Sequence, residues 1–273
     1  MAIRRVLIAN RGEIAVRIIR ACQTLGLETV APVSEADRDS LAARMADRAV
    51  CIGPAMASGS YLNVGALTAA ARGAGADSLH PGYGFLAESA ELADACERFG
   101  ITFVNARAEH LRQMGNKLEA RELVRNFGIP TLPGSKKVAS LEQAQAAAEQ
   151  IGFPVLFKVA AGGGGRGIKV VTEPAGLRHA FQTAAAEARA AFGDETLYLE
   201  RYLANARHVE VQVLGDRVGN TVHVGERDCT LQRRYQKLVE EAPAAHVAAP
   251  AREQLRQAGA TIAAKLRYES AGT

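Results

Sequence analysis

The sequence predicts an α/β protein with a parallel sheet in its first hundred residues and a smaller α+β unit behind it. Three observations predict this fold class. Short apolar runs alternate with segments of helical periodicity as far as about residue 104. Near Met114 the alternation stops, and the turn-rich segment Gly128–Gly134 follows. Two strand-like runs then enclose a glycine-rich stretch. Repeated βα units favour a parallel sheet covered by helices on both faces.

The first part of the chain is assigned element by element. Val6–Ala9 is a short apolar run that predicts a strand, and Gly26 ends the helix that follows it. Four residues at helical spacing form the buried stripe of that helix: Ile14, Ile18, Cys22 and Leu25. Pro32 should interrupt the second strand and weaken its hydrogen bonding. The remaining predictions are strands at 28–33, 49–52, 78–79 and 101–104, and helices at 62–71 and 91–99.

The second part mixes helices and strands without the βα repeat. A helix at 117–126 leads into the turn-rich segment, which reads as a hinge. The pattern then predicts a helix at 141–150, strands at 155–159 and 168–172, a helix at 175–191 and a strand at 197–200. Residues 209–213 and 221–224 alternate as strands that line a cleft would. A last helix is predicted at 250–267.

Composition excludes several classes of protein. Hydrophobic and charged contents of 48% and 23% are typical of a soluble globular chain. The net charge of +4 is dispersed, which disfavours a nucleic-acid partner. Apolar runs fall short of the ~20 residues that span a bilayer, and the N-terminus lacks a signal peptide's apolar region. The four cysteines are widely separated and predict buried free thiols in a reducing, cytoplasmic compartment: Cys22, Cys51, Cys96 and Cys229.

Four interpretations of the glycine loop, Gly162–Gly167, are considered. It satisfies the spacing of a dinucleotide-binding turn, but β-branched residues follow it where that motif requires a helix. A phosphate-binding Walker loop would need Ser or Thr after a Gly-Lys pair, and Gly167 is followed by Ile168. The remaining interpretation is a flap between antiparallel strands whose bare backbone closes over an anion, with Lys158 adding charge. A plain hairpin turn needs only one or two glycines.

Six segments in order resemble biotin carboxylase, the ATP-grasp component of biotin-dependent carboxylases, and the similarity covers essentially the whole chain. They are Asn10–Ala15, His80–Leu86, Met114–Lys117, the glycine loop, Arg207–Glu210 and Glu226–Pro243. The resemblance implies a Rossmann-like, parallel-sheet pre-ATP-grasp domain at 1–113. It further implies an ATP-grasp lid at 133–203 and an ATP-grasp main body at 114–132 and 204–273, whose sheet is incomplete.

The resemblance implies a reaction in which ATP and bicarbonate carboxylate N1 of biotin on a carrier protein. Lys117 and Lys158 match the two lysines that bind ATP phosphates, although a solvated lysine is the bland alternative. Flap residues in the implied nucleotide site are Gly163, Gly164, Gly165, Arg166 and Gly167. The acidic side chain of Glu200 and the backbone of the hinge that it begins hold adenine in the family. That hinge includes Tyr202 and Leu203.

Further residues match the ribose, bicarbonate and biotin positions. His208 and Gln232 match nucleotide contacts, although His208 could equally be satisfied by a carboxylate such as Glu210. Lys237 matches the lysine that holds bicarbonate or carboxyphosphate oxygens, and Gln236 precedes it in the same segment. Tyr235 replaces a common histidine, which should alter the ribose contacts.

Tyr83 and Gly84 match residues near the biotin ureido ring, and a tight turn is their alternative reading. At least one of Arg233 and Arg234 is expected to pair with Glu240 or Glu241.

The resemblance also sets expectations beyond this sequence. The glutamates that bind Mg²⁺ or Mn²⁺ should follow Thr273, so no metal ligand is assigned here. The chain is expected to be the N-terminal portion of its parent protein and inactive alone. Implied partners are a biotin carboxyl carrier protein or domain, a carboxyltransferase and a second copy bound through the N-terminal domain. Arg17 and Arg20 are candidate contacts with that second copy, or a solvated helix face.

Two other functions compete with this reading. One is a non-catalytic ATP-binding or assembly module that kept the flap and lost the chemistry. The other is a different ATP-grasp ligase, such as a carbamoyl phosphate synthetase domain. Tyr83, Gly84 and Lys237 argue against the second, because they belong to the biotin and bicarbonate part of the resemblance.

Overall fold

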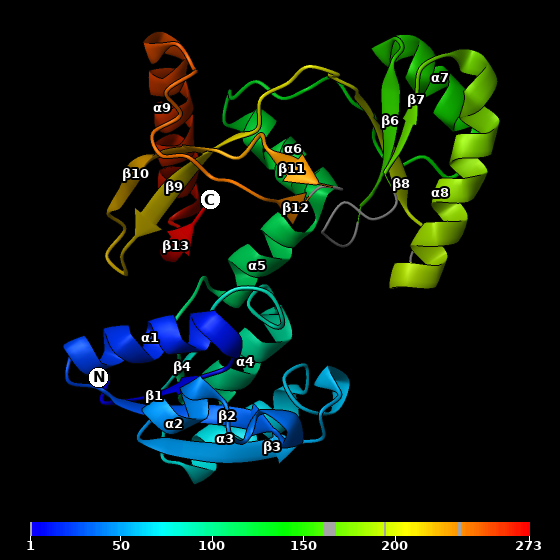
Figure 1. Ribbon diagram of the computed structural model, residues 1–273. Coiled ribbons are helices and arrows are strands. Elements are labelled where there is room, and N and C mark those ends of the chain that lie inside the picture. Colours follow the sequence, from blue (N-terminus) through cyan, green and yellow to red (C-terminus); the bar gives the residue numbers. More distant parts are fainter. Residues whose placement is uncertain (1, 161–167, 194, 234–235) are drawn as a thin grey trace. The chain divides into compact units, whose positions relative to one another are not determined.

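The computed structural model describes residues 2–160, 168–193, 195–233 and 236–273. The chain divides into two compact units, Met1–Arg112 and Gln113–Thr273 (Figure 1). Among the described residues, no helix combines the length and the apolar character needed to cross a membrane.

The first unit is built on a parallel five-stranded sheet in the order β3-β2-β1-β4-β5. Its strands are β1 (Arg5–Ile8), β2 (Glu28–Ser34), β3 (Arg48–Gly53), β4 (Ser78–His80) and β5 (Thr102–Phe103). Its helices are α1 (Gly12–Thr24), α2 (Leu41–Met45), α3 (Val64–Gly73) and α4 (Ala90–Arg98), and α5 (Ala108–Gly115) follows them. Leu7 packs into one hydrophobic cluster while Val6 and Ile8 pack into another, so helices cover both faces of the sheet. The predicted parallel sheet is confirmed.

Two details of the first unit differ from expectation. Leu25 is exposed, because it caps α1 instead of continuing it, and its side chain leaves the buried stripe. Pro32 does not interrupt β2. The pairing of β2 with β1 ends at Val30, so Pro32 faces only β3, where it pairs with Val50. A missing N–H is tolerated where a strand has one neighbour.

Three of the four cysteines are buried as predicted, and all four are free. Cys51 is exposed instead. It lies on β3, the edge strand of the sheet, where most side chains are reached by solvent.

In the second unit, an antiparallel sheet of order β7-β6-β8 lies beside two helices. These elements are α7 (Leu141–Ile151), β6 (Val155–Val159), β7 (Lys169–Val171), α8 (Leu177–Phe192) and β8 (Leu197–Arg201). Alternate residues of β6 point into one apolar core: Val155, Phe157 and Val159. Ala144 and Ala184 are fully buried there, and small side chains let α7 and α8 approach the sheet closely. The other face of the sheet carries Lys158 and Glu200 beside Leu156.

The rest of the second unit contains α6 (Lys117–Asn126) and a second antiparallel sheet, β10-β9-β13. Its strands are β9 (Val209–Gly215), β10 (Thr221–Asp228) and β13 (Ser270–Gly272), and α9 (Ala249–Leu266) packs against β9 and β10. A short hairpin is formed by β11 (Gln232–Arg233) and β12 (Gln236–Lys237). The predicted α/β class, with a parallel sheet followed by antiparallel sheets, is therefore what the chain adopts.

Candidate functional site

The polar face of the β7-β6-β8 sheet carries a charged cluster. Lys158 on β6 is paired in register with Tyr198 on β8, and Glu200 lies two residues further along β8. Side chains alternate across a strand, so all three project away from the apolar core that holds Phe157. The sequence places them there because each strand alternates apolar and polar positions at this point.

Glu200 is the centre of this cluster. Its residue surface is 6% exposed, and it makes two ion pairs. The Lys158 Nζ atom lies 2.6 Å from Glu200 Oε2, and the Arg121 Nε atom of α6 lies 3.4 Å from Oε1. A buried carboxylate is costly unless it is paired, and here each oxygen has a cationic partner.

Lys117 is the second cation that the sequence assigned to phosphate binding. It opens α6, whose N-cap residue Asn116 accepts hydrogen bonds from the backbone of Leu118 and Glu119. Burial first, and then the charge of Lys158, lower the pKa of Lys117 below its ordinary value. The structure thus brings the two predicted lysines into electrostatic range of each other. Glu200 pairs with Lys158 and Arg121, so the charge of Lys117 is left for a polyanion.

The glycine loop itself, with Gly163, Gly164, Gly165, Arg166 and Gly167, lies outside the described residues, as does Tyr235. The strands on either side of the loop are described. Phe157 on β6 pairs antiparallel with Lys169 on β7, which confirms that the loop joins antiparallel strands and does not open a helix. The hinge after β8 follows directly: Tyr202 N donates to Pro154 O at 3.0 Å, and Leu203 is exposed.

A second polar cluster lies at the start of β9. The side chain of Gln232 approaches His208 Nδ1 at 2.8 Å and donates to the carbonyl of Cys229. The backbone N–H of His208 donates to Thr230 Oγ1. The structure therefore brings the two predicted nucleotide contacts, His208 and Gln232, together. The ring contact of His208 at Nδ1 is with Gln232, and both oxygens of Glu210 are taken by Arg227 and Lys237.

Glu210 instead belongs to a network around Lys237. The Lys237 ammonium pairs with Glu210 and lies 3.4 Å from Glu240 Oε1. Arg227 Nε donates to the other oxygen of Glu210 at 2.8 Å. Burial alone would lower the pKa of Lys237, but the hydrogen bond and charge of Glu210 raise it above its ordinary value. Burial alone would raise the pKa of Glu210, but the hydrogen bonds and charges of Lys237 and Arg227 lower it below its ordinary value. Lys237 is held as a fixed cation.

Other predicted residues near this network have fewer partners. Gln236 pairs with Arg233 across the β11–β12 hairpin and is exposed. Arg233 makes no ion pair with Glu240 or Glu241 within the described part of the chain, and Arg234 lies outside it. Glu240 pairs with Lys237 instead.

Glu210, Cys229 and Glu240 lie close enough together to hold a metal ion. However, Lys237 and Arg227 already occupy both oxygens of Glu210. An ion there would have to displace two cations, so the cluster is better described as an ion-pair network.

The loop that carries Tyr83 and Gly84 belongs to the first unit. Asn10, which is buried, donates to the carbonyls of Pro81 at 2.8 Å and of Tyr83 at 2.7 Å. Gly84 has a φ of 66°, as a tight turn requires. The Tyr83 hydroxyl donates to Glu13. The ring of Tyr83 is therefore exposed but tethered.

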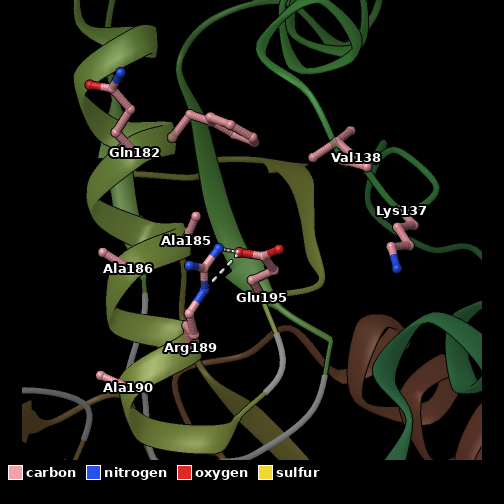
Figure 2. Close-up of a pocket in the computed structure, with 10 residues that line it drawn as sticks. Lys137, Val138, Gln182, Ala185, Ala186, Arg189, Ala190 and Glu195 are labelled. Carbon is pink, nitrogen blue, oxygen red and sulfur yellow. Dashed lines mark hydrogen bonds and ion pairs between the residues drawn. The ribbon is translucent and has the colours of Figure 1, made fainter.

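The cluster of Lys117, Lys158 and Glu200 does not line the cavity along α8. A cavity of 680 Å³ lies along α8 and is lined by Val138, Phe181 and a row of alanines (Figure 2). Its charged rim includes Arg189 and Glu195, which pair with each other. Neither Lys117, Lys158 nor Glu200 lines it.

Comparison with known proteins assigns the family. The family described as "Biotin carboxylase, N-terminal domain" matches residues 2–111. The family described as "Carbamoyl-phosphate synthase L chain, ATP binding domain" matches residues 116–273, more than half of the chain. Biotin carboxylase 1 of Bacillus subtilis is 49% identical over 272 residues, which are 99% of this chain and 60% of that protein. The chain belongs to the biotin carboxylase family.

Solved structures of biotin carboxylases share the fold. The Campylobacter jejuni biotin carboxylase in its β,γ-ATP complex matches with a TM-score of 0.96 and 45% identity, over 99% of this chain and 61% of that one. The biotin carboxylase domain dimer of Hydrogenobacter thermophilus 2-oxoglutarate carboxylase, in complex with MgADP, ADP and bicarbonate, matches with a TM-score of 0.94 and 43% identity. The match covers 99% of this chain and 60% of the 2-oxoglutarate carboxylase domain.

Within this biotin carboxylase fold, sequence reasoning missed Arg121 and Arg227 as partners of the assigned residues. Arg227 lies in the segment Glu226–Pro243 that carries the resemblance, but a β-bulge between His223 and Glu226 breaks the alternation that would have indicated its pairing with Glu210. Arg121 has no sequence signal. It is one of several charged residues on a polar helix, and only the folded chain brings it to Glu200.

Proposed function

We propose that this chain supplies the nucleotide-binding part of a biotin carboxylase, a ligase that uses ATP and bicarbonate to carboxylate biotin on a carrier protein. The observation that carries the proposal is the ion pair of Lys158 with the buried carboxylate of Glu200, together with the backbone N–H of Lys117, which donates to Ala160 O at 3.5 Å just before the glycine loop. In this assignment the lysines and the loop residues 163–167 bind phosphates. The Glu200–Leu203 hinge holds adenine.

The other assigned residues follow the course of the reaction. The terminal phosphoryl group of ATP is transferred to an oxygen of bicarbonate and ADP leaves. The bond between that oxygen and the carboxyl carbon then breaks, which releases phosphate, and the carbon is joined to N1 of biotin, which loses its proton. Lys237, fixed by Glu210, binds the bicarbonate oxygens, and His208, Gln232 and the 235–236 segment contact the nucleotide. Tyr83 and Gly84 face biotin.

Magnesium, when bound, would offset the charge that develops in phosphoryl transfer. The described residues of the nucleotide site fit the phosphates rather than the metal ion. They are chiefly cations, and their one carboxylate, Glu200, is already paired on both oxygens. Residues outside this cluster would hold the metal ion.

The proposed domains and partners extend this assignment. Residues 133–203 act as a lid over the nucleotide, and residues 114–132 and 204–273 form the body of the ATP-grasp unit. The dimer of the 2-oxoglutarate carboxylase domain supports a homodimer, whose interface we assign to the N-terminal domain. A biotin carrier, a carboxyltransferase and a cytoplasmic location complete the proposal.

Titration calorimetry of ATP with Mg²⁺ tests the nucleotide site. The unchanged chain should bind, and Lys158→Ala should lose about ten- to hundredfold in affinity, because a hydrogen bond to a charged group contributes about 1.5–3 kcal/mol. Lys169→Ala is the matched control. Lys169 lies on the opposite, helix-covered face of the same sheet and pairs with Glu187, so its removal should leave the affinity unchanged. Absence of binding by the unchanged chain would contradict the proposal.

A further inference from the structure

Arg121 connects three parts of the second unit. It extends from α6, and its side chain is only 15% exposed. Its Nη2 donates to Leu132 O at 2.8 Å, at the entrance to the β7-β6-β8 unit. Its Nε lies 3.4 Å from Glu200 Oε1, and its guanidinium carbon lies 5.6 Å from the centre of the Tyr198 ring. A guanidinium held by hydrogen bond, ion pair and ring contact has one defined position.

This position determines how Glu200 is oriented. Lys158 holds one carboxylate oxygen with a single flexible ammonium, and an ammonium does not fix the plane of a carboxylate. Arg121 holds the other oxygen from a different element. With both contacts in place, rotation of the carboxylate about its terminal bond is restricted. The lone pairs that remain free are presented in a constant direction.

Gly134 gives independent support for a site shaped around Arg121. A Cβ built at Gly134 would overlap the Arg121 guanidinium, lying 2.8 Å from its carbon. Gly134 is also bridged to Glu200 in antiparallel fashion. The absence of a side chain at position 134 therefore allows the guanidinium to lie against the backbone next to Glu200.

We propose that Arg121 is a positioning residue that makes the nucleotide site selective for adenine by fixing the Glu200 carboxylate. This inference rests on the proposed function, in which Glu200 accepts a hydrogen bond from adenine. A carboxylate only accepts, so it favours the 6-amino group of adenine and repels the 6-keto oxygen of hypoxanthine. That discrimination requires the carboxylate to hold a fixed direction, which Arg121 provides.

The test compares ATP with inosine triphosphate, each with Mg²⁺, by titration calorimetry. The unchanged chain should bind ATP more tightly. Arg121→Met should lose about tenfold in affinity for ATP and little for inosine triphosphate, because one hydrogen bond to a charged group is misaligned. The affinity of Arg121→Lys for ATP should lie between those of the unchanged chain and of Arg121→Met. Gly134→Ala should reproduce the loss of selectivity, because it displaces the guanidinium while leaving every charge in place.

Arg125→Met is the control, since Arg125 lies one turn further along α6, is exposed and bonds Thr131 instead of Glu200. It should leave both affinities unchanged. An equal loss for both nucleotides in Arg121→Met and Gly134→Ala would overturn the inference, because a merely structural role weakens both. If Arg121→Met does not fold, Arg121→Lys and Gly134→Ala test the inference by the same comparison of the affinity for ATP with the affinity for inosine triphosphate. Failure of the unchanged chain to bind either nucleotide would instead overturn the proposed function itself.

Discussion

Lys117 is expected to make ATP binding depend on pH. Burial and the neighbouring charge of Lys158 lower its pKa below the ordinary 10.5. Bound phosphates stabilise the protonated lysine, so binding takes up a proton wherever Lys117 in the free protein has partly lost its own. Affinity should therefore be highest below the lowered pKa and fall as the pH rises through it. This fall in affinity should begin at a lower pH than a lysine with an ordinary pKa would cause.

Calorimetry from about pH 7 to about pH 10, in two buffers with different ionisation heats, measures both the affinity and the proton uptake. Lys117→Arg stays charged throughout this range, so its affinity should not fall at alkaline pH. Lys169→Arg should behave like the unchanged chain. Proton uptake that persists in Lys117→Arg would assign the effect to another group.

At the level of single residues, sequence reasoning found the groups that lie in recognisable segments. Lys117, Lys158 and Glu200 belong to such segments, and the structure pairs Lys158 with Glu200 and brings Lys117 within electrostatic range of both. It did not find Arg121, because a contact between a helix residue and a strand 79 positions away depends on how α6 meets the sheet. Local spacing carries no information about that approach. Roles that depend on such contacts become visible only in the folded chain.

Glu226 is expected to anchor α9 to its sheet. Its side chain on β10 is fully buried, and Arg252 and Arg256 of α9 each donate to one of its oxygens at 2.5 Å. The hydrogen bond from Arg256, and then that from Arg252, lower its pKa from 4.5 to about 2, although burial opposes them. Glu226→Gln should destabilise the second unit by about 3 kcal/mol, at the low end for a broken buried pair because both arginines are partly exposed.

The pH dependence of unfolding separates this effect from a general loss of packing. A carboxylate with a lowered pKa contributes stability that is complete above its unfolded value of 4.5 and is lost as the pH falls toward about 2. Urea unfolding followed by circular dichroism should therefore show that the free energy of unfolding falls less steeply with decreasing pH in Glu226→Gln than in the unchanged chain. Glu253→Gln on the same helix removes a largely exposed carboxylate and should change stability by less than about 0.5 kcal/mol. Equal losses of stability in Glu226→Gln and Glu253→Gln would contradict the expectation that Glu226 holds α9 against its sheet.

At the level of elements, predictability followed length and periodicity. The helix at 117–126 and the strand at 155–159 have the predicted bounds. Apolar residues keep the helical period in the first, and the second is an apolar run that ends at the glycine loop. The strands β11, β12 and β13 were missed. Each has two or three residues, too few to establish an alternation, and each exists because a partner strand pairs with it. Such elements are created by tertiary contacts.

At the level of the whole molecule, all residues proposed to bind ATP lie in Gln113–Thr273, whereas Tyr83 and Gly84 lie in Met1–Arg112. A ligand that binds only the folded form stabilises the unit that holds it, by about 2.7 kcal/mol at a concentration of 100 times Kd. Saturating ATP should therefore slow hydrogen exchange in the core strands β6, β8 and β9 and leave β1, β2 and β4 unchanged. Lys158→Ala at the same nucleotide concentration should show much less protection. Equal protection of both units would mean that they unfold as one cooperative body, and that the division of the chain does not extend to its energetics.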